Sequence, residues 1–317
     1  MDSKLEKFLE DVPVFSQTWW LEAVAPGQWN YSVARRGEEI AAVLPYTYKI
    51  KFSRWKLLEM PGLTPYLGPY LRESSAKNSK RLGEEKDLMN ELIAGLPEYA
   101  SFQMAFHPKI TNWLPFYWKN FTASTRYTYL LPGPFEIDAI WKETAQNIRT
   151  DIRKAEKIVS ISTTEDFEIF LELHKATFFR QNKQLPFTEN FLRTLNLRIT
   201  EHGTKTIFVA YDKNKIPHAA IYILHDKTTD YYFLSGSDPS LRNSGALSLL
   251  IWTAIQNASK NGKSFDFEGS MVESIERFVR AFGAIQTPYF EIRQIPSFTI
   301  KIYRALYRLI RSLRGKL

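Results

Sequence analysis

The order of helices and strands in the second half of the chain restricts its fold more than any other feature. Apolar residues recurring every three or four positions predict helices at about 164–180 and 188–201. Alternating apolar residues then predict three strands, "TKTIFVAYD", "KIPHAAIYILHD" and "TTDYYFLSGSD". A helix in "NSGALSLLIWTAIQNASKNG", a strand at 264–268, a helix at 274–282 and a strand "YFEIRQI" follow. This uncommon order predicts an α+β, or mixed α/β, class.

The first half of the chain contains a similar mixed block, with strand-like runs such as "EIAAVLPYTYKI" and "ASFQMAF" and a helical "EEKDLMNELIAGL". A length of 317 residues fits two domains of about 150 residues each. Between the blocks, "IDAIWKETAQNIRTDIRKAEK" predicts a helix with a basic line along it. The expected division is an N-terminal domain 1–135, a linking basic helix 136–160, a C-terminal domain 161–300 and a terminal helix 301–317.

The composition is that of an ordinary globular protein, with 44% hydrophobic and 24% charged residues. Because the sequence contains no cysteine, a disulfide, a thiolate zinc site and a cysteine nucleophile are excluded. The five histidines include no HExxH motif and no pair four residues apart, so no metal site is predicted. The N-terminus mixes acids and bases, unlike a signal peptide, and we therefore expect a cytoplasmic protein.

The basic excess behind the net charge of +8 is concentrated at the end of the chain. Residues 301–317 contain no acid and carry Lys301, Arg304, Arg308, Arg311, Arg314 and Lys316. Apolar residues three or four apart lie between them, which predicts an amphipathic helix. Such a helix either packs its apolar stripe on the domain or contacts a membrane surface or a polyanion such as a tRNA backbone.

The stretch "SFDFEGSMVESIERFVRAFGA" predicts a strand, a glycine turn and a capped helix. Alternation along the strand places Asp266 and Glu268 on the same side. Two neighbouring carboxylates raise the pKa of one of them in a dry site, which suits a general base. The alternative is that both acids pair with arginines, including Arg277 in the following helix.

Four segments together carry a resemblance to a known superfamily. They are "NIRTDIRKAEK", "HKATFFRQNKQLPFT", "YYFLSGSDPSLRNSGALSLLIWTAI" and "FDFEGSMVESIERFVRAFGA". Their order and spacing resemble the GNAT acyltransferase fold, and two such blocks joined by a helix look like the Fem-type (FemAB-like) peptidoglycan bridge-forming aminoacyltransferases. The resemblance covers nearly the whole chain and implies two tandem GNAT-like domains. It also implies transfer of an acyl or aminoacyl group from an activated donor to an amine.

The resemblance further implies a donor-binding loop, because GNAT-type enzymes hold the donor's pyrophosphate on a glycine-containing loop at a helix N-terminus. "LRNSGALSLL" stands in that place, but Leu247 occupies the last small position of the usual loop. Both acyl-CoA and aminoacyl-tRNA therefore remain open as co-substrates, and no tightly bound cofactor is expected. The expected donor-binding residues are Ser235, Gly236, Ser237, Arg242, Ser244, Gly245 and Ala246. Backbone amides near Ser235–Ser237 are also candidates for stabilising the oxyanion.

Glu268 is the first candidate for the base that deprotonates the attacking amine, and Asp266 is the second. Guanidinium groups hold phosphate or carboxylate in a fork, and a glycine beside the base lets a ligand approach the backbone. The candidate substrate-binding residues are Arg149, Arg153, Arg180, Tyr66, Gly269 and Arg277. The ordinary alternative for the arginines is a solvated basic surface.

These features predict a bacterial N-acyltransferase or aminoacyltransferase that acts on an amine of a small molecule or a cell-envelope precursor. Transfer RNA is a candidate partner for the aminoacyl branch, and residues 301–317 are a candidate peripheral contact with the inner membrane. The alternative is a non-catalytic GNAT-fold protein that binds a membrane or a polyanion.

Overall fold

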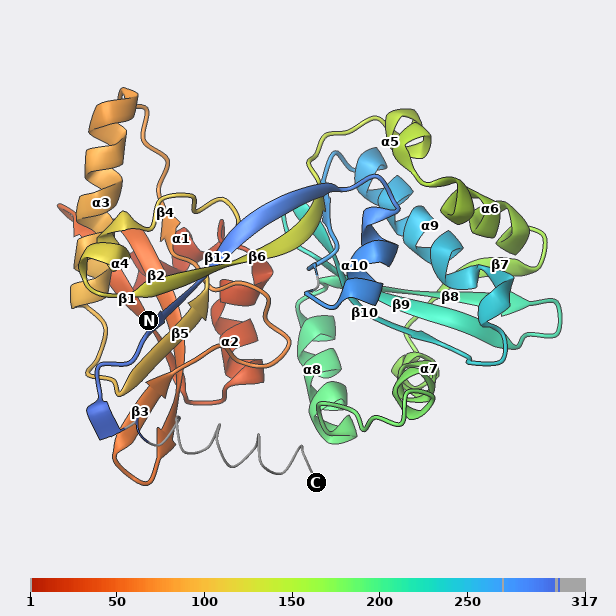
Figure 1. The fold of residues 1–317 in the computed structure, drawn as a ribbon, viewed down its shortest axis with the longest axis horizontal. Coiled ribbons are helices and arrows are strands. Elements are labelled where there is room, and N and C mark those ends of the chain that lie inside the picture. Colours follow the sequence, from red (N-terminus) through yellow and green to blue (C-terminus); the bar gives the residue numbers. More distant parts are fainter. Residues whose placement is uncertain (1, 270, 300–301, 303–317) are drawn as a thin grey trace. The chain divides into compact units, whose positions relative to one another are not determined.

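The computed structural model describes residues 2–269, 271–299 and 302, and it divides into two units (Figure 1). Unit 1 comprises residues 1–126 together with 288–317, and unit 2 comprises residues 127–287. Strands β6 (Thr122–Leu131) and β12 (Ile285–Gln294) each have residues in both units. The last strand therefore belongs mainly to unit 1, whereas we expected everything from 161 to 300 in one domain. The mixed α/β class is confirmed.

Unit 1 is built on a mixed sheet in the order β1-β2-β3-β5-β12, with β4 pairing with β2. Its strands enclose a core that includes Trp20, Leu44 and Phe102, each of them fully buried. Besides the two shared strands, its elements are α1 (Ser3–Leu9), η1 (Val14–Ser16), α2 (Thr18–Val24), β1 (Trp29–Arg36), β2 (Glu39–Lys51), β3 (Trp55–Leu58), β4 (Tyr70–Leu71), α3 (Asn78–Ala94), β5 (Ser101–Ala105) and α4 (Leu114–Trp118).

Unit 2 contains α5 (Ile137–Glu143), α6 (Gln146–Ala155), β7 (Val159–Thr164), α7 (Phe167–Phe179), α8 (Glu189–Glu201), β8 (Lys205–Asp212), β9 (Pro217–His225), β10 (Thr229–Ser237), η2 (Arg242–Ser244), α9 (Ala246–Lys260), β11 (Ser264–Asp266) and α10 (Glu273–Arg280). Its strand order is β6-β11-β10-β9-β8-β7. Helices α7 and α8 lie on one side of this sheet, and α6 and α9 lie on the other (Figure 1). Helix α9 is apolar on most of its surface, so it is buried against the sheet.

Two details of unit 2 differ from the sequence-based expectation. The single helix expected over 136–160 is two helices, because the backbone is extended at Thr144, whose hydroxyl donates to the Ile140 carbonyl (2.8 Å). The Ala145 amide then donates to the Ala281 carbonyl (2.8 Å), which holds the joint against the end of α10. Strand β7 was not expected, because "VSISTT" is too polar to show an apolar alternation.

Candidate active site

Strands β10 and β11, in the middle of the unit 2 sheet, separate next to Glu268, the candidate general base. Strand β10 pairs in parallel with β11 only from Thr229 opposite Ser264 to Tyr231 opposite Asp266. Beyond Tyr231, β10 continues to Ser237 against β9, while the Phe267 amide turns to the Tyr129 carbonyl of β6 (3.0 Å). Among the described residues, the edge of β10 that faced β11 therefore has no strand beside it after Tyr231.

Glu268 lies immediately after this parting point, in a left-handed turn. Its φ is +55° and that of Gly269 is +61°, so the extended conformation ends before Glu268. The expectation that Asp266 and Glu268 share one side of a strand through 268 is wrong, because β11 ends at Asp266. A Cβ at position 269 would lie 2.2 Å from the Tyr127 carbonyl oxygen, so glycine is required there for packing against β6.

Asp266 and Glu268 have different environments. The Asp266 Oδ1 accepts hydrogen bonds from the Thr128 hydroxyl (2.5 Å) and from the Glu268 backbone amide (2.8 Å). The Glu268 Oε1 is buried and has no hydrogen-bond partner among the described residues. Burial, and then the negative charge of Asp266, raise the pKa of Glu268 well above its ordinary value of 4.5. Asp266 therefore fixes the turn, while Glu268 has a buried carboxyl group able to take up a proton.

Tyr232 is a further candidate at the same place, which sequence reasoning did not single out. It follows the last residue of β10 that pairs with β11, and its ring centroid lies 6.2 Å from that of Phe267. Burial raises the pKa of Tyr232 to about 12, against the opposing effect of a hydrogen bond with the Ser235 side chain. The phenol therefore keeps its proton at neutral pH and is able to donate it. Its position in the strand "TTDYYFLSGSD" was the only available signal.

The end of β10 is packed closely against α7. The Ser235 carbonyl accepts from His174 Nδ1 (2.7 Å), and the Ser237 amide donates to the Thr177 hydroxyl (3.0 Å). A Cβ at Gly236 would lie 2.3 Å from the His174 backbone nitrogen. The Ser237 amide is thus already hydrogen-bonded within the protein, and Gly236 is explained by helix packing.

The expected donor loop forms η2 and the start of α9. Gly245 has φ +77°, and a Cβ there would lie 2.4 Å from the Asp151 carbonyl oxygen of α6. The Ala246 amide donates to the Ser244 hydroxyl (3.3 Å), while Arg242 is exposed. The close approach of α6 therefore accounts for the glycine without a ligand.

Of the other expected substrate-binding residues, Arg149 and Arg153 of α6 contact α5. Arg149 donates to the Trp141 and Lys142 carbonyls (3.2 and 3.3 Å), so its guanidinium group caps α5. The Arg153 guanidinium lies 5.6 Å from the centroid of the Trp141 ring. Arg180 is exposed at the end of α7. Both Arg149 and Arg153 thus join α5 to α6.

Arg277 and Tyr66 were also expected to bind substrate, and the structure gives both of them other contacts. Arg277 is exposed and pairs with Glu273 on its own helix (3.2 Å). Tyr66 is only 1% exposed and packs edge-on against His107 and Tyr289 within unit 1, so it is a core residue and not a surface contact. Ser270, the expected N-cap of the helix after the glycine turn, lies outside the described residues. So does the basic helix expected at 301–317, apart from Ile302.

A pocket of about 700 Å³ lies where α7 leads into α8. Its apolar wall includes Phe178, Phe179 and Phe187, and Phe179 is 84% exposed. Its charged residues are Glu172, Lys175, Lys183 and Glu189. The pocket therefore combines aromatic surface with charges of both signs.

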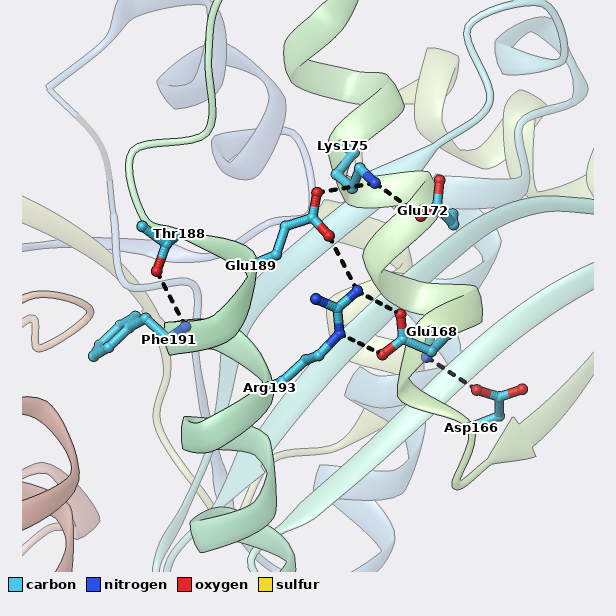
Figure 2. A network of polar contacts seen from close by, with 8 residues as sticks. All are labelled: Asp166, Glu168, Glu172, Lys175, Thr188, Glu189, Phe191 and Arg193. Atoms are coloured by element: carbon cyan, nitrogen blue, oxygen red, sulfur yellow. Dashed lines mark hydrogen bonds and ion pairs between the residues drawn. The ribbon is translucent and has the colours of Figure 1, made fainter.

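A network of ion pairs holds α7 and α8 together beside this pocket (Figure 2). Arg193 of α8 makes two bonds to Glu168 of α7 (both 2.8 Å) and one to Glu189 (3.0 Å). Lys175 joins Glu172 (2.9 Å) and Glu189 (3.0 Å). Glu189, at the first turn of α8, thus links both basic residues and positions one side of the pocket.

The described part of the chain shows no group of three or more His, Asp or Glu side chains arranged to hold a metal ion. Nor do its described helices include one with the length and apolar character needed to cross a membrane.

Comparison with known proteins finds similar domains and folds. Residues 142–271 match the family described as "Acetyltransferase (GNAT) domain". The structure of FemX aligns over 98% of both chains at 14% identity, with a TM-score of 0.67. L-PGS from Bacillus licheniformis aligns over 96% of this chain and 95% of its own at 11% identity, with a TM-score of 0.53. No curated protein matches the sequence.

The matched region contains the parting strands, the loop before α9 and Glu268, so residues 142–271 are similar to a GNAT acetyltransferase domain. The alignment with FemX extends over both units, so the fold of this chain is similar to that of FemX.

Proposed function

We propose that the protein transfers an acyl or aminoacyl group to a primary amine, with Glu268 as the general base. The observation that supports this most directly is the buried Glu268 Oε1, which lacks a partner among the described residues. A carboxyl group whose pKa is raised well above its ordinary value accepts a proton from an ammonium or amine far better than an ordinary surface glutamate.

In the proposed reaction, the amine nitrogen attacks the carbonyl carbon of the activated donor while Glu268 takes the proton released from nitrogen. The tetrahedral intermediate then expels a thiol from an acyl-CoA, or a ribose hydroxyl from an aminoacyl-tRNA. Tyr232 supplies the proton that the leaving group needs, because its phenol is protonated at neutral pH. The proton on Glu268 is then released to solvent, and Tyr232 is reprotonated.

The acceptor is proposed to be a cell-envelope precursor that carries an amine. The fold likeness to FemX and to L-PGS supports an aminoacyl or envelope-related reaction. The pocket between α7 and α8 suits the apolar part of such an acceptor, since Phe178, Phe179 and Phe187 line it.

The test measures thermal stability of the purified protein with acetyl-CoA, longer acyl-CoAs, free CoA, charged tRNA and uncharged tRNA. A donor present at 100 times its dissociation constant stabilises the protein by about 2.7 kcal/mol. A shift with CoA compounds selects the thioester branch, and a shift with charged tRNA beyond that with uncharged tRNA selects the aminoacyl branch. Transfer to no amine from any of these donors would contradict the proposal.

A further inference from the structure

The hairpin of β2 and β3 in unit 1 carries two exposed apolar side chains near its tip. The register runs from Tyr48 opposite Leu58 to Lys51 opposite Trp55. Phe52 and Ser53 in the turn both have positive φ, at 51° and 55°. Ile50 is 51% exposed and Phe52 is 63% exposed. Two large apolar side chains are therefore presented to solvent at the end of one hairpin.

The base of the hairpin is fixed, so the tip projects from a rigid element. Leu57 and Leu58 are buried, and Trp55 packs with Leu57 and Ile295 within unit 1. The Phe52 and Trp55 rings meet edge-on, with centroids 5.3 Å apart. Phe52 therefore remains exposed on a hairpin that is held in place in the folded unit 1.

The tip is strongly cationic. Residues 49–56 include Lys49, Lys51, Arg54 and Lys56 and no acid. Lys49 pairs with Glu59 at 3.0 Å, and the Arg54 guanidinium lies 4.7 Å from the centroid of the Trp55 ring. Four basic residues therefore lie within four positions of Ile50 or Phe52 along the chain, and the segment contains no acid.

Apolar residues ringed by Lys and Arg are suited to the interface of an anionic bilayer. The apolar side chains enter the boundary between headgroups and acyl chains, and the cations remain at the level of the lipid phosphates. A nucleic acid suits this tip less well, because the aliphatic Ile50 cannot stack on a base as an aromatic ring does.

Ile295 packs against the base of the hairpin, and Phe298, three residues further along the chain, is 73% exposed. We propose that the hairpin tip formed by residues 49–56 is a contact site for an anionic lipid bilayer surface. The contact is independent of the proposed transfer chemistry.

The absence of cysteine from the sequence allows a direct test with the full chain. A single cysteine introduced by Ser53→Cys is labelled with an environment-sensitive dye and mixed with vesicles. The matched control is Asn214→Cys in the β8–β9 turn, which also carries two lysines and an exposed Ile216. We expect a blue shift and brighter emission at position 53 with phosphatidylcholine–phosphatidylglycerol vesicles, and no change at 214 or with phosphatidylcholine alone.

Variants then identify the groups responsible. Lys51→Gln with Arg54→Gln should weaken binding to the anionic vesicles about 30-fold, because each basic residue near such a surface contributes about 1 kcal/mol. Ile50→Ser with Phe52→Ser should abolish the dye response, whereas Ile216→Ser should leave it unchanged. Circular dichroism and thermal unfolding confirm that each variant is folded.

Three outcomes would overturn the proposal. One is an unchanged dye at position 53 while the protein binds vesicles, which would assign binding to another segment. Another is equal loss of binding in Ile216→Ser. The third is hairpin-dependent binding of tRNA with no binding of anionic vesicles.

Discussion

The Asp266 carboxylate accepts a 2.8 Å hydrogen bond from the backbone amide of Glu268, two residues further along the chain. This bond closes the turn in which Glu268 adopts a left-handed conformation and brings a second negative charge close to its carboxyl group. Asp266 therefore helps to position Glu268 and adds to the effect of burial in raising its pKa.

Glu268→Gln should lower kcat/KM for amine transfer by about 10²–10⁴-fold, because the amide cannot accept the proton from the attacking nitrogen. The fold should be retained, since Gln has nearly the same shape and the Oε1 makes no hydrogen bond among the described residues. Steady-state kinetics with the donor that the thermal-stability test identifies provides the measurement. Retention of more than a tenth of the activity would rule out Glu268 as the base.

The rate of transfer should rise with pH through the raised pKa of Glu268, because only the ionised carboxylate accepts a proton. Asp266→Asn should move this limb of the kcat/KM profile to lower pH, since the Asp266 charge contributes to the upward shift. Asparagine retains an oxygen for the Thr128 and Glu268 donors. Asp138→Asn, on the exposed surface of α5, is the control and should leave the profile unchanged.

Burial of Glu268 should make the protein less stable as pH rises. The folded state retains the Glu268 proton above the ordinary pKa of 4.5 and the unfolded state does not, so the free energy of unfolding falls from that pH up to the raised pKa. Denaturant unfolding at a series of pH values should show this fall in the wild type and its loss in Glu268→Gln. Identical pH dependence in the two proteins would show that Glu268 titrates normally.

Gly245→Ala should destabilise the protein more than Gly262→Ala. Both glycines have positive φ, at +77° and +66°, but only at Gly245 would a Cβ meet backbone, 2.4 Å from the Asp151 oxygen, while Gly262 faces open space. Gly262→Ala should cost about 1 kcal/mol through strain alone, and Gly245→Ala several kcal/mol more. Thermal unfolding compares the two, and equal costs would show that the contact between α6 and the loop is loose.

Arg149→Gln should act on stability and leave substrate affinity nearly unchanged. Its guanidinium donates to two carbonyls at the end of α5, and loss of hydrogen bonds from a charged donor costs about 1–3 kcal/mol. Arg153→Gln, which loses only a ring contact, should cost less. A raised KM in Arg149→Gln with unchanged stability would instead assign the residue to substrate binding.

The sequence was sufficient to predict the mixed class and most elements of unit 2, because their apolar periods are strong. Helix α8 was expected at 188–201 and is Glu189–Glu201, for example. Strand β7 escaped detection because its residues are polar and only Val159 is buried. The division at Thr144 was also missed, since a threonine hydroxyl bonded to its own helix leaves no periodic signal.

The candidate base could be found from the sequence, but its environment could not. Alternation suggested that Asp266 and Glu268 lie on the same side of a strand. A left-handed turn instead separates Asp266, whose Oδ1 accepts two hydrogen bonds, from Glu268, whose Oε1 has no partner among the described residues. Tyr66 and Arg149 were misleading for another reason. Residue type indicates what a side chain can bind, and only packing shows whether a neighbouring carbonyl or ring already occupies it.

Strand β12 completes the sheet of unit 1 by pairing with β5, from Glu291 opposite Ala105 to Gln294 opposite Phe102. The whole of unit 2 lies between these partners in the chain. On the ribosome, unit 2 is therefore synthesised in full before unit 1 receives its last strand. Unit 2, which is continuous in the sequence, should therefore fold first during synthesis. The N-terminal segment should complete its sheet only after β12 has been made.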